Sequence, residues 1–270
     1  MKFYLLIILL VLEFIALAQS KKEQIENLNY QIDSLNQVVL NEKKLNTNST
    51  FEISQLNAEL TRLNASISSL NAVISEQIGP YKTVQIGTQV WMTKNRDVAT
   101  FRNGDPIPEA KTKEEWKKAG KTMQPAWCYY NYDPANGAKY GKLYNWYAVN
   151  DKRGLAPVGY HIPSDAEWSQ LIDYLGGEVV AGAKMKGGKL GYYANNESGF
   201  SGLPGGFCYL NGEFYGDGER CVWWSSTEYE DYSKDDTNSA WNRNTNFATE
   251  VVFRSQHSKE SGFSVRCLKD

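Results

Sequence analysis

The residue types that break helices are confined to one part of this chain. No Gly, Pro, Trp or Cys occurs before Gly79, and all 22 Gly, 8 Pro, 8 Trp and 4 Cys of the sequence lie at or after that position. A segment without Gly or Pro can form long helices, whereas Gly-rich, aromatic sequence is typical of a domain with many turns. The sequence therefore predicts a helical segment followed by a globular head, with residues 79–83 as the linker.

The amino terminus carries an export signal. Lys2 precedes an apolar run over residues 3–12, and Ala16-Leu17-Ala18 has the small residues that signal peptidases require. We expect residues 1–18 to be a signal peptide cleaved after Ala18, which leaves no transmembrane helix and places the protein in the periplasm, on the cell surface or outside the cell. A retained anchor is the alternative, although Glu13 interrupts the apolar run.

Residues 19–78 repeat apolar side chains at heptad spacing, which predicts an α-helical coiled coil. A lone helix cannot bury so narrow an apolar stripe, so we expect parallel self-association into a dimer or a trimer. Asn46 falls on the same seam, where a polar residue fixes register at some cost in stability. The residues expected at the oligomer interface are Ile25, Leu28, Ile32, Leu35, Val39, Asn46, Ile53, Leu56, Leu60, Leu63, Ile67, Leu70 and Ile74.

Two other arrangements of the same segment are a helix folded back on its own head and an antiparallel hairpin that breaks near residues 46–50. The unbroken heptad phase argues against the hairpin, because a turn has no reason to preserve the phase.

The charge balance excludes one class of partner. The chain has 29 Lys and Arg against 31 Asp and Glu, for a net charge of −2. No broad basic surface is available for a phosphate backbone, so we expect no nucleic acid partner.

Short elements separated by turns fill the rest of the chain. We expect a hairpin of residues 83–86 and 89–92, and helices opened by capping boxes at Thr112 and Ser164. Asn211-Gly212 predicts a second hairpin with a type I′ turn. Further strands are expected at residues 222–226, 247–253 and 263–268. This pattern predicts an α+β head with a mainly antiparallel sheet.

Several sequence blocks in the head resemble one family. They are VQIGTQVWMTKN (84–95), AWCYYNYDPANGAKYGKLYNWYAV (126–149), GLAPVGYHIPSDAEW (154–168), YLGG (174–177), NNESGFSGLPGG (195–206), WWSSTE (223–228) and SGFSVRC (261–267). In these blocks the chain resembles the Fibrobacter succinogenes major paralogous domain family over residues 84–270. The resemblance implies a C-type-lectin-like fold, related to that of formylglycine-generating enzymes.

The resemblance also implies a cysteine pairing. Family members of this kind tend to have Cys at the positions of Cys128 and Cys267, which suggests one disulfide. Cys208 and Cys221 flank the Asn211-Gly212 hairpin and suggest the other. Four cysteines in an exported chain allow three connectivities, so this pairing is a prediction.

Catalytic motifs are missing from the head sequence. It contains two histidines, His161 and His257, and none of the HExxH, GxSxG or phosphate-loop patterns. We expect His161 to make a structural hydrogen bond and His257 to lie in a solvated turn. We therefore expect that the chain is not an enzyme. The alternative is that it is an enzyme related to the formylglycine-generating group.

An acidic and aromatic region supplies the candidate ligand-binding residues. Carboxylates suit Ca²⁺, and tryptophan rings stack on sugars or pack on a protein partner. The acidic stretch from Glu228 to Asp236 is expected to be a solvated loop, with a calcium site as the alternative, and we expect no cofactor. Trp223 and Trp224 alternate on a strand, so we expect one of them to lie in the core. The candidate residues are Trp223, Trp224, Glu228, Asp231, Asp235, Asp236, Trp241 and Asn242.

Export, a coiled coil and a lectin-like head together suggest a surface or secreted adhesion protein that binds an unidentified glycan or protein. Several heads on one stalk raise avidity. A structural component of the envelope is the alternative of a different class.

Overall fold

A computed structural model describes residues 2–45, 50–78, 81–187, 193–231 and 236–270. The chain forms two compact units, Met1–Pro80 and Tyr81–Asp270. Each unit is described by itself below.

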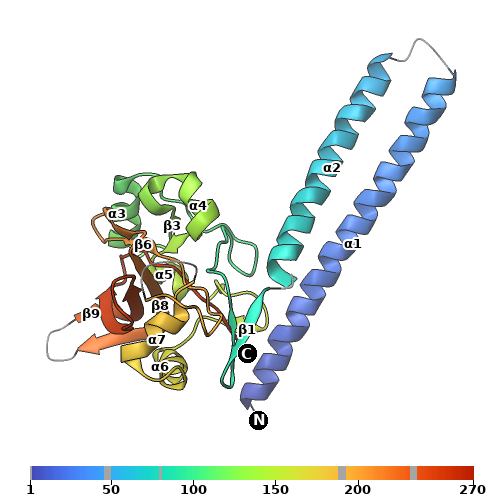
Figure 1. Ribbon diagram of the computed structural model, residues 1–270. Coiled ribbons are helices and arrows are strands. Elements are labelled where there is room, and N and C mark those ends of the chain that lie inside the picture. The colour runs from blue at the N-terminus through green and yellow to red at the C-terminus, as the bar shows by residue number, and fades with distance from the viewer. Residues whose placement is uncertain (1, 46–49, 79–80, 188–192, 232–235) are drawn as a thin grey trace. The chain divides into compact units, whose positions relative to one another are not determined.

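The amino-terminal unit consists of two long helices. Helix α1 (Lys2–Leu45) and helix α2 (Thr50–Ile78) pack side by side and run in opposite directions (Figure 1). The prediction of a single uninterrupted helix is therefore wrong, and the structure has the antiparallel pair that the heptad phase disfavoured. Heptad spacing does not distinguish a coiled coil between chains from an antiparallel helix pair within one chain. The same apolar stripe can pack against either partner.

The apolar seam of this unit is only partly buried by the pairing. Val39 and Leu63 are buried, whereas Ile25, Ile32 and Leu56 remain half-exposed. Asn46 lies outside the described residues, as do the side chains of Leu70 and Ile74. Over the part of the chain that the structure describes, no helix is both long enough and apolar enough to cross a bilayer.

One sheet of the head joins strands from its two ends. Its order is β1 (Thr83–Ile86), β2 (Gln89–Met92), β11 (Leu268–Lys269) and β5 (Tyr160–His161), all antiparallel. Trp91 pairs with Val84 on one side and Leu268 on the other. The predicted hairpin of residues 83–86 and 89–92 is confirmed.

A second sheet contains the longest strands. Strands β8 (Arg220–Asp231), β9 (Asp236–Asn246) and β10 (Phe253–Ser258) form an antiparallel meander with β9 in the centre. The strand predicted at residues 222–226 is confirmed and lies within β8, whereas the strand predicted at residues 247–253 is misplaced. The acidic stretch 228–236, expected to be a solvated loop, is strand at residues 228–231 and at Asp236. Residues 263–268 pair mostly through isolated bridges, such as Phe263 with Tyr144.

Two short ribbons and several helices complete the head. The ribbons are β3 (Trp127–Cys128) with β4 (Leu143–Tyr144), and β6 (Gly205–Cys208) with β7 (Phe214–Asp217). The helices are α3 (Lys113–Lys121), the 3-10 helix η1 (Tyr130–Tyr132), α4 (Pro134–Tyr140), α5 (Trp146–Val149), α6 (Asp165–Tyr174) and α7 (Glu178–Met185). With its mainly antiparallel small sheets, the head is an α+β domain, as predicted.

Helix α6 shows how local sequence places an element. Ser164 caps it by accepting a hydrogen bond from the Glu167 amide, and Glu167 accepts one from the Ser164 amide, which is the predicted capping box. Trp168, Leu171 and Ile172 form its buried face. Thr112 caps α3 by accepting from the Glu115 amide, but the Glu115 carboxylate accepts from the Lys111 amide, so the capping box predicted at Thr112 is only half formed.

Aromatic rings dominate the core beneath α6. Trp168 lies 4.7 Å from Trp91 and 5.9 Å from Trp223 between ring centroids, and Phe200 contacts all three rings. All four side chains are fully buried. Edge-to-face packing of such rings adds to the free energy gained from burying their area.

Candidate functional site

Two of the predicted ligand-binding residues belong to the core. Trp223 and Trp224 are both 0% exposed. The Trp223 indole N–H donates to Asn95 and that of Trp224 donates to the Tyr144 carbonyl. One of the two rings was expected in the core, and the structure buries both, so the expectation that the other is exposed for stacking is wrong. Residues 223 and 224 pack into different core clusters on opposite sides of strand β8.

Trp241 and Asn242 are likewise engaged within the protein. The Arg254 guanidinium carbon lies 3.4 Å from the Trp241 ring centroid, and Tyr229 packs edge-on against the same ring at 4.9 Å. Asn242 is fully buried and donates to the Ser255 carbonyl. Asn242 is therefore inaccessible to a ligand, and the Arg254 guanidinium lies over the partly buried Trp241 ring.

The predicted acidic residues are dispersed along two strands. The Glu228 carboxylate accepts a hydrogen bond from Lys259 at 3.1 Å. Asp235 lies outside the described residues, and so do the side chains of Asp231 and Asp236. Within the described residues, no group of three or more His, Cys, Asp or Glu side chains is arranged to hold a metal ion.

The two histidines have structural partners. His161 lies between two carboxylates, with Nδ1 at 2.7 Å from Asp270 and Nε2 at 2.9 Å from Glu167, so the expected structural hydrogen bond is confirmed. His257 lies in strand β10 rather than in a solvated turn, which corrects that prediction. Its Nδ1 accepts a hydrogen bond from the Asn242 amide, and burial, with a smaller effect of Arg220, lowers its pKa.

The predicted disulfides are not present in the described structure. Cys128, Cys208, Cys221 and Cys267 are all free thiols and all buried. Cys267 packs in a different core cluster from Cys128, and Cys221 in a different one from Cys208, so both predicted pairings are wrong for this structure. Proximity in sequence misleads for Cys208 and Cys221, because they leave the hairpin toward separate cores.

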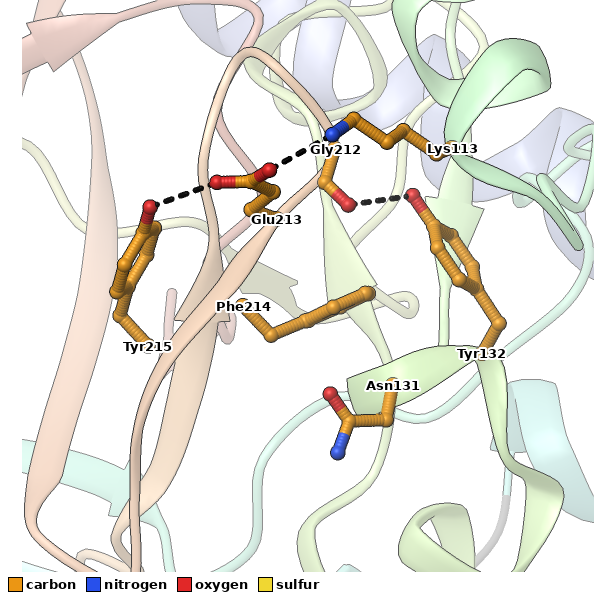
Figure 2. A pocket seen from close by; sticks show the side chains of 7 residues that line it. All are labelled: Lys113, Asn131, Tyr132, Gly212, Glu213, Phe214 and Tyr215. Atoms are coloured by element: carbon orange, nitrogen blue, oxygen red, sulfur yellow. Dashed lines mark hydrogen bonds and ion pairs between the residues drawn. The ribbon is translucent and has the colours of Figure 1, made fainter.

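A pocket of about 510 Å³ opens beside the loop between β6 and β7. One wall comes from helix α3 and helix η1, and the other from the loop and the start of strand β7 (Figure 2). Its lining residues are Lys113, Asn131, Tyr132, Gly212, Glu213, Phe214 and Tyr215.

Hydrogen bonds hold the two walls of this pocket together. The Tyr132 hydroxyl donates to the Gly212 carbonyl at 3.0 Å, and the Lys113 ammonium donates to Glu213 at 2.7 Å (Figure 2). The Tyr215 hydroxyl donates to the other Glu213 oxygen at 2.9 Å. The Phe214 ring packs edge-on against Tyr132 at 4.7 Å.

These contacts set the electrostatics of the pocket. Hydrogen bonds from Lys113, and then from Tyr215, lower the pKa of Glu213, and the same contacts raise the pKa values of both donors. Burial raises the pKa of Tyr132, with neighbouring Cys208 and Cys128 adding to the effect. At neutral pH the site therefore has one cation, one anion and neutral phenols.

The backbone of helix η1 is strained at the pocket. Asn131 has φ 54° and Tyr132 has φ 55°, so two consecutive residues with side chains adopt the left-handed region. Each such residue costs about 1–3 kcal/mol and persists only where the surroundings enforce it, which is frequent at binding sites. The exposed Asn131 amide has no hydrogen-bond partner among the described residues and is available to a ligand.

An aromatic surface continues from the pocket along the hairpin. Tyr215 lies 5.7 Å from Phe207 and 6.3 Å from Tyr209, and both tyrosines are exposed. Tyr209 directly follows strand β6, and Tyr215 pairs with Phe207 across the ribbon. The pocket thus opens next to rings that face solvent.

The sequence indicates this site only indirectly, through the residues around Asn211-Gly212. Asn211-Gly212 predicts a hairpin, but only Gly212 has a positive φ, so the turn is not type I′. The connection instead spans residues 209–213, with the Tyr209 amide donating to the Glu213 carbonyl. The aromatic residues on both sides of Asn211-Gly212 are the local signal that could have indicated a binding surface.

Comparison with known proteins identifies the head. The model of the Fibrobacter succinogenes major domain family matches residues 84–269. No curated protein and no solved structure matches the chain. The matched range contains every residue of the pocket.

Proposed function

The chain belongs to the Fibrobacter succinogenes major domain family, and from this premise we propose that it is an exported binding protein whose head recognises a neutral saccharide in the pocket beside Gly212. The observation that carries the proposal is the free Asn131 amide, held in a strained conformation at the edge of an aromatic pocket. Preorganised polar groups among aromatic rings are typical of small-ligand sites.

The charges of the pocket favour an uncharged ligand. Lys113 and Glu213 pair with each other at 2.7 Å, so neither presents an unopposed charge to a phosphate or a carboxylate. The Tyr215 ring and the Asn131 amide remain exposed and supply a stacking face and hydrogen bonds for hydroxyl groups. A single shallow pocket of this kind is expected to bind weakly.

We also propose that identical copies associate through the helical unit. Its seam residues Ile25, Ile32 and Leu56 stay half-exposed in one chain, and association of two or three helix pairs into a coiled-coil-like bundle would bury them. Linked heads would raise the overall affinity by about 10²- to 10⁴-fold over that of one site. Removal of residues 1–18 would leave the rest of α1 nearly equal in length to α2, which supports cleavage of a signal peptide there.

The remaining parts of the proposal come from the sequence. The family resemblance suggests a C-type-lectin-like fold for the head, the missing catalytic motifs suggest a non-catalytic role, and the export signal suggests a location in the periplasm, on the cell surface or outside the cell. The buried cysteines support a non-catalytic role, since burial raises the pKa of Cys221 to about 12 and of Cys267 to about 11, whereas reactive thiols are accessible and have lowered pKa values.

A glycan array probed with the full chain and with residues 81–270 tests the proposal. We expect binding by the full chain, weaker binding by the head, and loss of binding in Asn131→Gly, which keeps the left-handed backbone but removes the amide. Tyr215→Ala should lose binding by roughly 10-fold or more, whereas the exposed Tyr174→Ala, outside the pocket, is the matched control. A full chain that binds no glycan would favour a structural role in the envelope instead.

A further inference from the structure

Two of the four cysteines lie together beneath the pocket. Cys128 and Cys208 are both 0% exposed and belong to one core cluster with Tyr130 and Trp116. Burial, and after it the interaction with Cys208, raises the pKa of the Cys128 thiol. The two thiols therefore lie close together in one buried cluster, although 80 residues of sequence separate them.

The other two cysteines lack such a neighbour. Cys221 packs in the cluster of Trp91 and Trp168, and it is the only cysteine of that cluster. Cys267 packs in the cluster of Phe101 and Trp146, again as its only cysteine. The described structure thus brings together one pair of thiols, and it is neither of the pairs that the family resemblance implies.

Backbone pairing holds Cys128 and Cys208 in place from different directions. Cys128 pairs with Leu143 in the β3–β4 ribbon. Cys208 exchanges two backbone hydrogen bonds with Gly262, of 2.9 and 2.7 Å. Both cysteines are thus held by backbone pairing within one buried cluster, and a disulfide requires two cysteines that the fold holds close together.

We propose that Cys128 and Cys208 form a disulfide when the chain folds in an oxidising compartment. A thiolate of one cysteine attacks a disulfide oxidant, such as an oxidised thiol–disulfide exchange protein, and displaces one of its thiols. The second cysteine then attacks the mixed disulfide and displaces the other thiol. Two thiols of this chain lose two electrons and two protons in total, and the oxidant gains them as two thiols. The reaction must occur before the core closes, because both sulfur atoms are buried in the fold.

This disulfide would connect the two walls of the pocket. Cys128 lies two residues before helix η1, which contributes Asn131 and Tyr132, and Cys208 ends strand β6 just before the loop that contributes Gly212. A covalent link at the base would limit the relative movement of these walls and so preorganise the site. The cross-link itself does not depend on the proposed ligand.

The connectivity can be tested on the full chain without a ligand. The protein is refolded in a mixture of reduced and oxidised glutathione, its remaining thiols are blocked, and its peptides are mapped without reduction. We expect one disulfide, between Cys128 and Cys208, with Cys221 and Cys267 recovered as blocked thiols. Recovery of a Cys128–Cys267 or Cys208–Cys221 peptide, or of four blocked thiols, overturns the proposal.

Variants give a second measurement. Closing an 80-residue loop should raise the melting temperature, so a reducing agent should lower it by roughly 10 °C in the oxidised wild type. Cys128→Ala and Cys208→Ala should show no response to the reducing agent. Cys221→Ala, which removes a buried cysteine elsewhere, should retain the full response. Equal changes in melting temperature in the three variants contradict the proposal. A failure to bind glycans leaves the disulfide proposal unaffected and counts only against the proposed function.

Discussion

The Tyr132 hydroxyl donates a 3.0 Å hydrogen bond to the Gly212 carbonyl and so joins helix η1 to the hairpin loop across the pocket. Residue 132 is itself held in the left-handed backbone region. The strained backbone on one wall of the pocket is therefore held in place by a hydrogen bond to the other wall.

Tyr132→Phe should loosen the pocket without unfolding the head. The substitution removes one hydrogen bond and leaves the ring contact with Phe214, so we expect a loss of about 0.5–1.5 kcal/mol in the free energy of unfolding. Amide exchange of residues 209–213 should become faster, and ligand affinity should fall. Tyr147→Phe, which removes a hydrogen bond to Asn238 outside the pocket, is the control that should leave that exchange unchanged.

The ion pair at the pocket should respond to acid. Because the pKa of Glu213 is lowered from its usual 4.5 by Lys113 and Tyr215, the network is complete above about pH 4.5 and is lost as the pH falls through the lower folded value. NMR titration of the Glu213 carboxyl should give a midpoint below 4.5. In Lys113→Met the midpoint should rise toward 4.5, and an unchanged midpoint would exclude the ion pair in solution.

His257 should make the stability of the head depend on pH in a different range. Its pKa is lowered below the usual 6.5, so the unfolded chain takes up this proton at a higher pH than the folded one. The contribution is complete above about pH 6.5 and decreases as the pH falls below it. Urea unfolding between pH 7 and pH 5 should show a smaller loss in His257→Gln than in the wild type.

Trp223→Ala should act on stability rather than on a binding face. Removing this buried ring leaves a cavity beside Trp168 and Phe200, and such changes cost about 3–5 kcal/mol. Trp241→Ala should cost less, because Trp241 is only partly buried. Equal costs measured by chemical unfolding would contradict the core position of Trp223.

Asp165 should be essential for burying Arg243. Burial opposes ionisation of Asp165, but hydrogen bonds from Arg254 and Arg243 outweigh it and lower the pKa of this carboxyl. Asp165→Ala leaves the buried Arg243 guanidinium without its counter-charge, at a cost of about 3–5 kcal/mol in the free energy of unfolding. Arg254→Ala, at the partly exposed side of the same carboxylate, should cost much less.

Local signals predicted the elements that local interactions form. The hairpin at residues 83–92 has a Gly with positive φ at its turn, Gly87, and the capping box of α6 lies within four residues. The long strand β9 and the end of strand β8 were missed for a physical reason. Asn242, Arg243 and Thr245 are polar and yet buried, since distant partners satisfy them, and no pattern of apolar alternation reveals such a strand.

The pocket could not be predicted for a related reason. It joins residue 113, residues 131–132 and residues 212–215, and the strain at Asn131 is visible only in the folded backbone. The same holds for the thiols of Cys128 and Cys208, whose proximity is a property of the tertiary structure.

The position of strand β11 between β2 and β5 has a consequence for biosynthesis. Trp91 is made early in the head, but its partner Leu268 is added only after nearly all of the other head residues. This sheet cannot assemble on the ribosome while the chain is growing, and its long-range pairing makes folding slow. The head therefore completes its fold only when almost all of its residues have been synthesised, because the strand that joins β2 to β5 is one of the last segments to be made.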